Sequence, residues 1–213
     1  RFDFLITQNK IKSFVEVKNV TLSRKYGLAE FPDSVTARGS KHISNLIEAT
    51  KQGYKSYLLF VVQREDCKTF KIASDIDPKY SDGRALVQLI KANTFVELGN
   101  IEDAIKVLED VSVNSDYSSI YRETADFKSI LLSDSNLTEK LEKLLTYTQP
   151  GSAFRNIALE ETSLIQIQLG QINDAAITLT NLLQEPTISQ GQAKRSSDLL
   201  RTLSEPKGAD VQD

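Results

Sequence analysis

The chain has 213 residues, a length that suits one large domain or two small ones. Its content of 40% hydrophobic and 26% charged residues is typical of a globular protein and argues against a disordered chain. The single cysteine excludes an internal disulfide framework, so we expect a reducing, cytoplasmic environment. The longest apolar run, residues 57–62, is far shorter than a membrane span requires. Because the first residue is Arg1 rather than Met, we expect a fragment or a mature segment.

The net charge of −3 is unevenly distributed along the chain. Residues 1–82 carry 14 basic and 10 acidic residues, whereas residues 83–213 carry 12 basic and 19 acidic ones. A difference of this kind between two halves suggests separate surfaces with separate partners. The basic half is compatible with a phosphate-bearing partner, although its excess charge is too small to require one.

Strand patterns dominate the first 80 residues. Residues 2–6 and 13–18 are aromatic and β-branched and alternate with a period close to two, which predicts two strands. The polar residues 7–10 between them favour an antiparallel hairpin. A third short strand is expected at 29–31. Residues 57–63 are apolar on both faces, which predicts a central strand covered by helices.

One helix is expected among these strands. Asp33 or Ser34 can cap its N-terminus, and Gly53 can end it. Between them, Ile43, Leu46 and Ile47 follow helical spacing. The first segment therefore has the predicted order β-β-β-α-β.

From Asp82 onward the patterns are helical. Seven helices joined by short turns are predicted, at about 84–98, 101–112, 117–133, 137–147, 153–169, 172–184 and 190–203. This half is therefore expected to be all-α. Residues 205–213 follow the last helix and predict a disordered tail.

An internal repeat lies in the helical half. Residues 98–104 and 169–175 both have the pattern L-G-x-I-x-D-A, 71 positions apart. The glycine allows the left-handed backbone that ends one helix, and the alanine lets the next helix cross closely. Two unrelated helical hairpins that end in the same way are the simpler alternative. The spacing is about twice the 34-residue period of tetratricopeptide repeats, and the half resembles a protein of that class.

Residues 155–160 and 169–171 are also similar to the ancillary translocon subunit (YfgM-like) family. Repeats of this kind bind peptides or partner proteins and carry no catalytic residues. The resemblance therefore implies a protein or peptide partner for the helical half.

Two carboxylates and a lysine in the first segment form a second pattern, D…E-x-K. Glu16 and Lys18 are two positions apart in a strand, so they project from the same face, and the predicted hairpin brings Asp3 close to Glu16. Two carboxylates can hold Mg²⁺, and the metal with the lysine can stabilise charge at a phosphate. The pattern resembles the core of PD-(D/E)xK nucleases. Many strands, however, end in Glu and Lys simply because these side chains reach solvent.

Longer stretches carry a further resemblance. Residues 14–22, 31–42, 60–64 and 75–78, taken in order, are similar to the sugar fermentation stimulation protein A (SfsA) family. This resemblance implies a DNA-binding protein with a nuclease-like core. It also implies metal ligation by Asp3 and Glu16, a catalytic role for Lys18, and nucleic-acid contacts by Thr36, Arg38 and Lys41. Family members have a further N-terminal half and a final strand after the position of Tyr80, and in this sequence residues 81–84 instead lead directly into the helical half.

His42 is the chain's single histidine. It follows Lys41 on the predicted helix, where a polar surface or site-lining role is commoner than general-base catalysis. Both roles remain open from the residues alone.

The sequence thus predicts an α+β protein with a partial α/β nuclease-like domain at 1–82 and an all-α, tetratricopeptide-like module of helical hairpins at 83–204. The predicted function is DNA binding of the SfsA type, with a Mg²⁺-dependent phosphodiesterase site and a protein-interaction module. The alternative is a non-enzymatic adaptor or chaperone-like scaffold in which the first segment is a relic.

Overall fold

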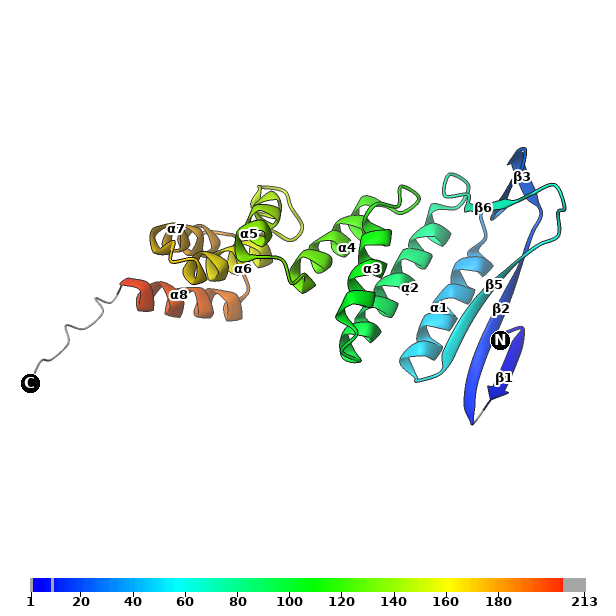
Figure 1. The fold of residues 1–213 in the computed structure, drawn as a ribbon, viewed down its shortest axis with the longest axis horizontal. Coiled ribbons are helices and arrows are strands. Elements are labelled where there is room, and N and C mark those ends of the chain that lie inside the picture. The colour runs from blue at the N-terminus through cyan, green and yellow to red at the C-terminus, as the bar shows by residue number, and fades with distance from the viewer. Residues whose placement is uncertain (1, 9, 205–213) are drawn as a thin grey trace, which may run out of the picture. The chain divides into compact units, whose positions relative to one another are not determined.

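The computed structural model describes residues 2–8 and 10–204 and has a mixed α+β fold (Figure 1). The strands are β1 (Phe4–Gln8), β2 (Ile11–Val20), β3 (Leu22–Lys25), β4 (Leu28–Phe31), β5 (Lys55–Val62) and β6 (Thr69–Ile72). The helices are α1 (Ala37–Lys51), α2 (Pro78–Glu97), α3 (Ile101–Ser112), α4 (Ser119–Leu132), α5 (Leu137–Leu145), α6 (Arg155–Gln168), α7 (Ile172–Leu183) and α8 (Gln190–Ser204), with a short 3₁₀ helix, η1, at Thr146–Thr148. The predicted tail, 205–213, lies outside the described residues.

The first sheet has the strand order β1-β2-β5. β1 and β2 form the predicted antiparallel hairpin, with Phe4 opposite Val15. β2 and β5 are parallel, with Glu16 opposite Leu58. Helix α1 follows β3 and β4 in the chain, directly precedes β5, and packs on β5 and β2. The face of the sheet that carries Glu16 and Leu58 is therefore the face that α1 covers.

The position of β5 differs from the prediction. This strand is at an edge of the described sheet rather than at its centre. Leu58 and Phe60 pack into the core below α1, whereas Tyr57 and Leu59 on the other face are about half exposed. The apolar pattern correctly indicated hydrophobic side chains on both faces. It carried no information about whether a neighbouring strand pairs with the second edge.

A second sheet, with the order β3-β4-β6, was missed in part. Only β4 was predicted. β3 and β6 have four residues each, and β3, with the sequence Leu-Ser-Arg-Lys, has no apolar alternation. Gly27, with a positive φ of 78°, connects β3 to β4 in a tight antiparallel pair. Such short strands depend on pairing with neighbours rather than on a local pattern.

Helix α1 starts later than predicted. Thr36, and not Asp33 or Ser34, is its N-cap, and the Thr36 hydroxyl accepts a hydrogen bond from the Gly39 N–H at 3.0 Å. The predicted C-terminal stop is confirmed, because Gly53 has a positive φ of 86° and its N–H donates to the Thr50 carbonyl.

The core of this part of the chain centres on Tyr80 of α2. Tyr80 is fully buried with Ile43 of α1 and Ile72 of β6, and Phe31 packs its ring 5.2 Å from the Tyr80 ring. Burial raises the pKa of the Tyr80 phenol well above its usual range. At the start of α2, the Asp77 carboxylate accepts hydrogen bonds from the N–H groups of both Tyr80 and Thr36. One buried carboxylate therefore joins the N-termini of α1 and α2.

The structure divides into two compact units, residues 1–126 and 127–213. The predicted domain limit near residue 82 falls inside α2, which packs beside α1 in the first unit. The predicted domain ranges, 1–82 for the SfsA-like segment and 83–204 for the tetratricopeptide-like segment, stay a prediction. No strand is found in the described residues beyond β6, as the helical pattern from Asp82 predicted, and each of the seven predicted helices is present.

The two copies of L-G-x-I-x-D-A form the same turn. Gly99 and Gly170 have φ values of 77° and 74°. The N–H of the residue after each glycine donates to a carbonyl five positions earlier, at 2.8 Å in both copies. Ala104 and Ala175 are both fully buried. The repeated sequence therefore specifies a repeated helix–turn–helix, α2–α3 in the first unit and α6–α7 in the second.

The second unit has a core of its own. Leu144 is fully buried in a cluster with the side chains Phe127, Ile130, Leu141, Ala158 and Ile165. Phe127 stacks on Phe154 at a centroid distance of 4.8 Å. In the described part of the chain, no helix has both the length and the apolar character needed to cross a membrane.

Candidate functional site

Glu16 and Lys18 lie on the face of β2 that α1 covers. The Glu16 side chain is only 2% exposed, and the Lys18 ammonium donates to Glu16 Oε1 at 2.7 Å. Removing a carboxylate from water is costly unless it is paired and hydrogen-bonded. The lysine two positions along the strand provides that pairing. The sequence prediction that both side chains share one face is therefore confirmed.

His42 of α1 completes this buried group. Its Nδ1 contacts Glu16 Oε1 and lies 3.1 Å from Lys18 Nζ. On the other side of the ring, the guanidinium of Arg38 donates from Nε to His42 Nε2 at 3.4 Å. Lys18 and Arg38 carry only donor groups, and they approach different nitrogens of the ring. The imidazole is therefore held between Glu16 and Lys18 on one side and Arg38 on the other.

Asp3 lies one residue before β1, not within a strand as predicted. Since the next residue, Phe4, is opposite Val15, Asp3 is at the level of Glu16 on the neighbouring strand. Its carboxylate accepts a hydrogen bond from the Val17 N–H at 2.8 Å. This bond holds Asp3 beside the end of the D…E-x-K pattern, as the predicted hairpin required.

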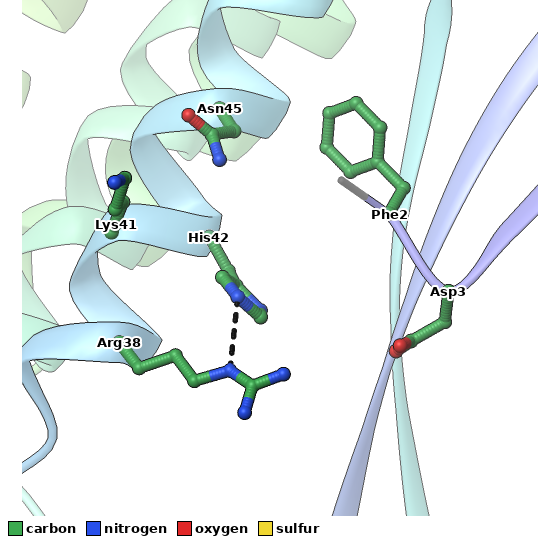
Figure 2. Close-up of a pocket in the computed structure, with 6 residues that line it drawn as sticks. All are labelled: Phe2, Asp3, Arg38, Lys41, His42 and Asn45. Atoms are coloured by element: carbon green, nitrogen blue, oxygen red, sulfur yellow. Dashed lines mark hydrogen bonds between the residues drawn. The ribbon is translucent and has the colours of Figure 1, made fainter.

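A pocket of about 540 Å³ lies between Asp3 and helix α1 (Figure 2). Arg38, Lys41, His42 and Asn45 line it from the helix, and Phe2 and Asp3 line it from the other side. The four helical residues are spaced so that they share one face of α1. In Figure 2 the Asp3 carboxylate points toward the helix, across from His42 and Arg38. The pocket therefore combines two basic side chains with one carboxylate, and His42 connects it to the buried Glu16.

The predicted site residues occupy different places around this pocket. Arg38 and Lys41 line it together with Asp3, whereas Lys18 is directed at Glu16 and His42. Thr36 caps α1 with its hydroxyl. The roles predicted for these side chains in catalysis, metal binding and nucleic-acid contact stay predictions.

Of the pocket residues, Asn45 was not predicted, and His42 was predicted only as a polar surface or site-lining residue without a stated partner. Both could have been found by spacing, because they lie four and seven positions after Arg38. The contact between His42 and Glu16, in contrast, depends on how α1 packs across the sheet. No local pattern reports that packing.

The Glu16 carboxylate also provides a test of whether the site suits a cation. Its Oε2 is buried and has no hydrogen-bond partner among the described residues, which is costly for a carboxylate oxygen. A hard divalent cation takes such oxygens as ligands. The described residues contain no group of three or more His, Cys, Asp and Glu side chains placed to hold a metal. The groups in the described residues that suit a divalent cation are therefore the unpaired Oε2 of Glu16 and the carboxylate of Asp3 on the neighbouring strand.

Comparison with known proteins locates the family resemblance in the N-terminal part of the chain. Residues 1–98 match the family model described as "Sugar fermentation stimulation protein RE domain". A sugar fermentation stimulation protein homolog of Pelagibacter ubique is 60% identical over 93 residues, which cover 44% of this chain and 40% of the relative. A homolog of a Ruegeria species is 55% identical over 82 residues, 38% of this chain and 35% of the relative.

A solved structure, described as that of Pyrococcus furiosus SfsA in complex with Ca²⁺, is 34% identical, covers 37% of this chain and 34% of its own, and has a TM-score of 0.35. The chain thus spans about two fifths or less of the length of these curated relatives. The family model ends at the last turn of α2, and helices α3 to α8 lie beyond it. The matches do not support the resemblance of the helical part to tetratricopeptide or YfgM-like proteins. The comparisons thus show that residues 1–98 of this chain are similar to the SfsA family.

Proposed function

We propose that the segment similar to the SfsA family binds the phosphodiester backbone of DNA and holds a divalent cation beside it, at the pocket between Asp3 and α1. The observation that carries the proposal is the buried Glu16 carboxylate, which has an unpaired oxygen and contacts His42, a residue that lines the pocket together with Arg38 and Lys41. Anionic ligands of a cation and donors for a phosphate belong together at sites of phosphodiester chemistry.

The helix face would provide the phosphate contacts. Arg38 is exposed, and its side chain makes one long hydrogen bond, to His42, so its remaining donors can reach an anion. Lys41 is exposed on the same face and adds a second cation. Such contacts position nucleic acid without reading its sequence. We therefore expect binding that depends on charge and weakens with salt.

Glu16 and Asp3 would hold the cation, and Lys18 would keep Glu16 in place. When bound, Mg²⁺ or a similar ion supplies positive charge that stabilises a phosphate and lowers the pKa of a water. Lys18 already donates to Oε1 of Glu16, so the opposite oxygen, Oε2, remains for the cation. Hydrolysis of a phosphodiester would require this ion, whereas binding of the phosphate would require only Arg38 and Lys41.

Cation binding is tested by thermal unfolding with Mg²⁺ or Mn²⁺. A ligand that binds the folded state alone stabilises it, by about 2.7 kcal/mol at a concentration 100 times its dissociation constant. We expect the ions to raise the melting temperature of the wild type and to have little effect on Glu16→Gln. Glu139→Gln, an exposed carboxylate of α5, is the control and should respond as the wild type does. An equal shift in wild type and Glu16→Gln contradicts the site.

DNA binding is tested by the salt dependence of retention on a DNA column. The logarithm of the binding constant falls with the logarithm of salt in proportion to the phosphate contacts, by about 0.9 per contact on duplex DNA. Arg38→Ala with Lys41→Ala should weaken retention and reduce the slope by roughly two contacts. The pair Lys106→Ala with Lys128→Ala removes the same charge outside the segment similar to the SfsA family and should have less effect. If both double variants elute together, the helix face is not the phosphate contact.

For the helical part we propose a protein-interaction role. The repeated helix–turn–helix of α2–α3 and α6–α7 supports it, since hairpins of this kind commonly build binding surfaces. If the helical part alone is active, neither DNA retention nor cation stabilisation will be found for the full chain.

A further inference from the structure

A second, larger pocket of about 1000 Å³ lies away from the Asp3 site, along strand β5. Three elements form its walls: α1, β5 and the face of α2 that carries Arg84, Val87, Lys91 and Phe95. We call this pocket the β5 groove. Its lining is largely apolar and includes Ile47 of α1, Leu58 and Phe60 of β5, and Val87 and Phe95 of α2.

One wall of the β5 groove is the unpaired edge of a sheet. Strand β5 pairs with β2 over eight positions, and in the described chain no strand pairs with its other edge. An edge strand presents a row of backbone N–H and C=O groups that can pair with another chain. Natural edges are usually protected by charge, proline or a bulge. β5 has only Lys55, at its first position, and no proline.

The dimensions and side chains of the groove fit an extended peptide. Eight residues of β5 correspond to about 26 Å of strand at roughly 3.3 Å per residue. A strand added there would direct alternate side chains toward the apolar faces of α1 and α2. The charged residues that line the groove are Lys55, Arg84 and Lys91 against a single acid, Glu97. This excess of positive charge is complementary to acidic residues in the occupant.

We propose that the β5 groove binds an extended segment of a partner protein as an additional strand on β5. The segment has apolar side chains at alternate positions and acidic residues near its ends. Its backbone hydrogen bonds go to the free edge of β5, and its apolar side chains fill the space between α1 and α2. This mode of recognition uses main-chain bonds for affinity and side-chain pockets for selectivity.

The test uses the full 213-residue chain and a fluorescein-labelled heptapeptide of sequence EVTVTVE. Binding is measured by fluorescence anisotropy. The control is a peptide of the same sequence that is N-methylated at the amides facing β5. It keeps the side chains but loses the backbone N–H donors that would bond to the strand edge. We expect it to bind at least about tenfold more weakly, since tenfold corresponds to 1.4 kcal/mol, roughly one net hydrogen bond. Equal binding of the two peptides, or no binding of the first, overturns the proposal.

Two charge substitutions on α2 provide a matched pair. Val87 lines the groove and is 39% exposed, whereas its neighbour Leu86 is 37% exposed and does not line it. Val87→Glu should weaken peptide binding about tenfold or more, because it places a charge against apolar side chains. Leu86→Glu should leave binding unchanged. Both positions are exposed enough for the variants to fold, which circular dichroism checks. Equal affinity of both variants contradicts the groove as the site.

Amide hydrogen exchange locates the contact. On peptide binding, amides of β5 that face the free edge should exchange more slowly, whereas those of β1 should not change. A second copy of the chain is the competing occupant. If sedimentation shows a dimer in which the β5 amides are already protected and the peptide does not bind, the groove serves self-association, and the peptide proposal is wrong.

Discussion

Gly39 lies where the first turn of α1 meets α2 and has no room for a side chain. A Cβ at this position would lie 2.7 Å from Thr36 Cγ2 and 3.2 Å from the Tyr80 ring. Thr36 is the helix cap, and Tyr80 is fully buried, so neither can move without loss of other contacts. Glycine here therefore allows α1 and α2 to approach closely next to the candidate site.

Gly39→Ala should consequently destabilise the chain, although alanine favours helices. Overpacking costs typically about 1–3 kcal/mol, which outweighs a helix-propensity gain of about 1 kcal/mol. Urea unfolding measures the difference. Gly191→Ala in α8 is the control, because the nearest atom to its added Cβ is the end of Arg195 at 3.5 Å. That variant should be neutral or slightly more stable, and a similar gain for Gly39→Ala would contradict the close packing.

At the scale of single residues, the sequence predicted which side chains share a strand face better than it predicted which side chains from distant segments touch. The spacing of Glu16 and Lys18 was enough to predict a shared strand face, because side chains alternate along any strand. The role of His42 was not predictable from spacing. Its contact with Glu16, 26 positions away, exists only once α1 crosses the sheet. The cap of α1 was likewise not predictable from residue type. Asp33, Ser34 and Thr36 all have side chains that can cap a helix, and the backbone geometry of the folded chain selects Thr36.

At the scale of elements, the two glycine turns show how far a local pattern reaches. Gly99 and Gly170 both end a helix with a left-handed backbone, and no atom lies within 4 Å of a Cβ placed on either. Substitution at these positions therefore costs only backbone strain. The two turns give a direct measure of that strain in the same protein.

Gly99→Ala and Gly170→Ala should each destabilise the unit that contains them, by about 1–2 kcal/mol for an L-residue in the left-handed region. Asparagine tolerates this conformation better, so Gly170→Asn should cost less than Gly170→Ala. Hydrogen exchange of α3 or α7 amides reports each unit separately. If alanine and asparagine cost the same, the positive φ is not the cause.

The strands were less predictable than the helices for a related reason. A helix satisfies its hydrogen bonds within one segment, so its periodicity and end residues are local. β3 and β6 have four residues each and exist because β4 lies between them. The apolar side chains on both faces of β5 were predicted correctly. Its position at the edge of the sheet was not, because that position depends on which other strands pair with it.

At the scale of the whole molecule, each unit has a buried or half-buried carboxylate paired with an arginine. In the first unit, the hydrogen bonds from Arg24 hold the pKa of Glu30 below its usual value of 4.5. In the second, the hydrogen bonds from Arg195 lower the pKa of Glu160 in the same way. Both pairs join positions that are separate in the sequence, and Glu30 is largely buried.

A lowered pKa in the folded state makes stability depend on pH. The contribution of Glu30 is fully present above pH 4.5 and is lost as the pH falls through its lowered folded pKa. We therefore expect Glu30→Gln to be less stable than the wild type at pH 7 and the difference to narrow below pH 4. Urea midpoints across this range measure it. Glu65→Gln, in the loop after β5, should follow the wild type at every pH. A difference independent of pH would exclude the ion pair as its source.

The sequence by itself determined the hairpin, the seven helices of the second half, the two repeated turns and the shared face of Glu16 and Lys18. These features depend on periodicity, end residues and short-range spacing, which a chain carries locally. Only the tertiary structure decided that His42 completes the buried group at Glu16, that β5 lies at a sheet edge beside an apolar groove, and that the compact units divide at residue 126. Each of these depends on contacts between segments far apart in the chain, whose side chains and backbone groups find their partners only when the elements pack.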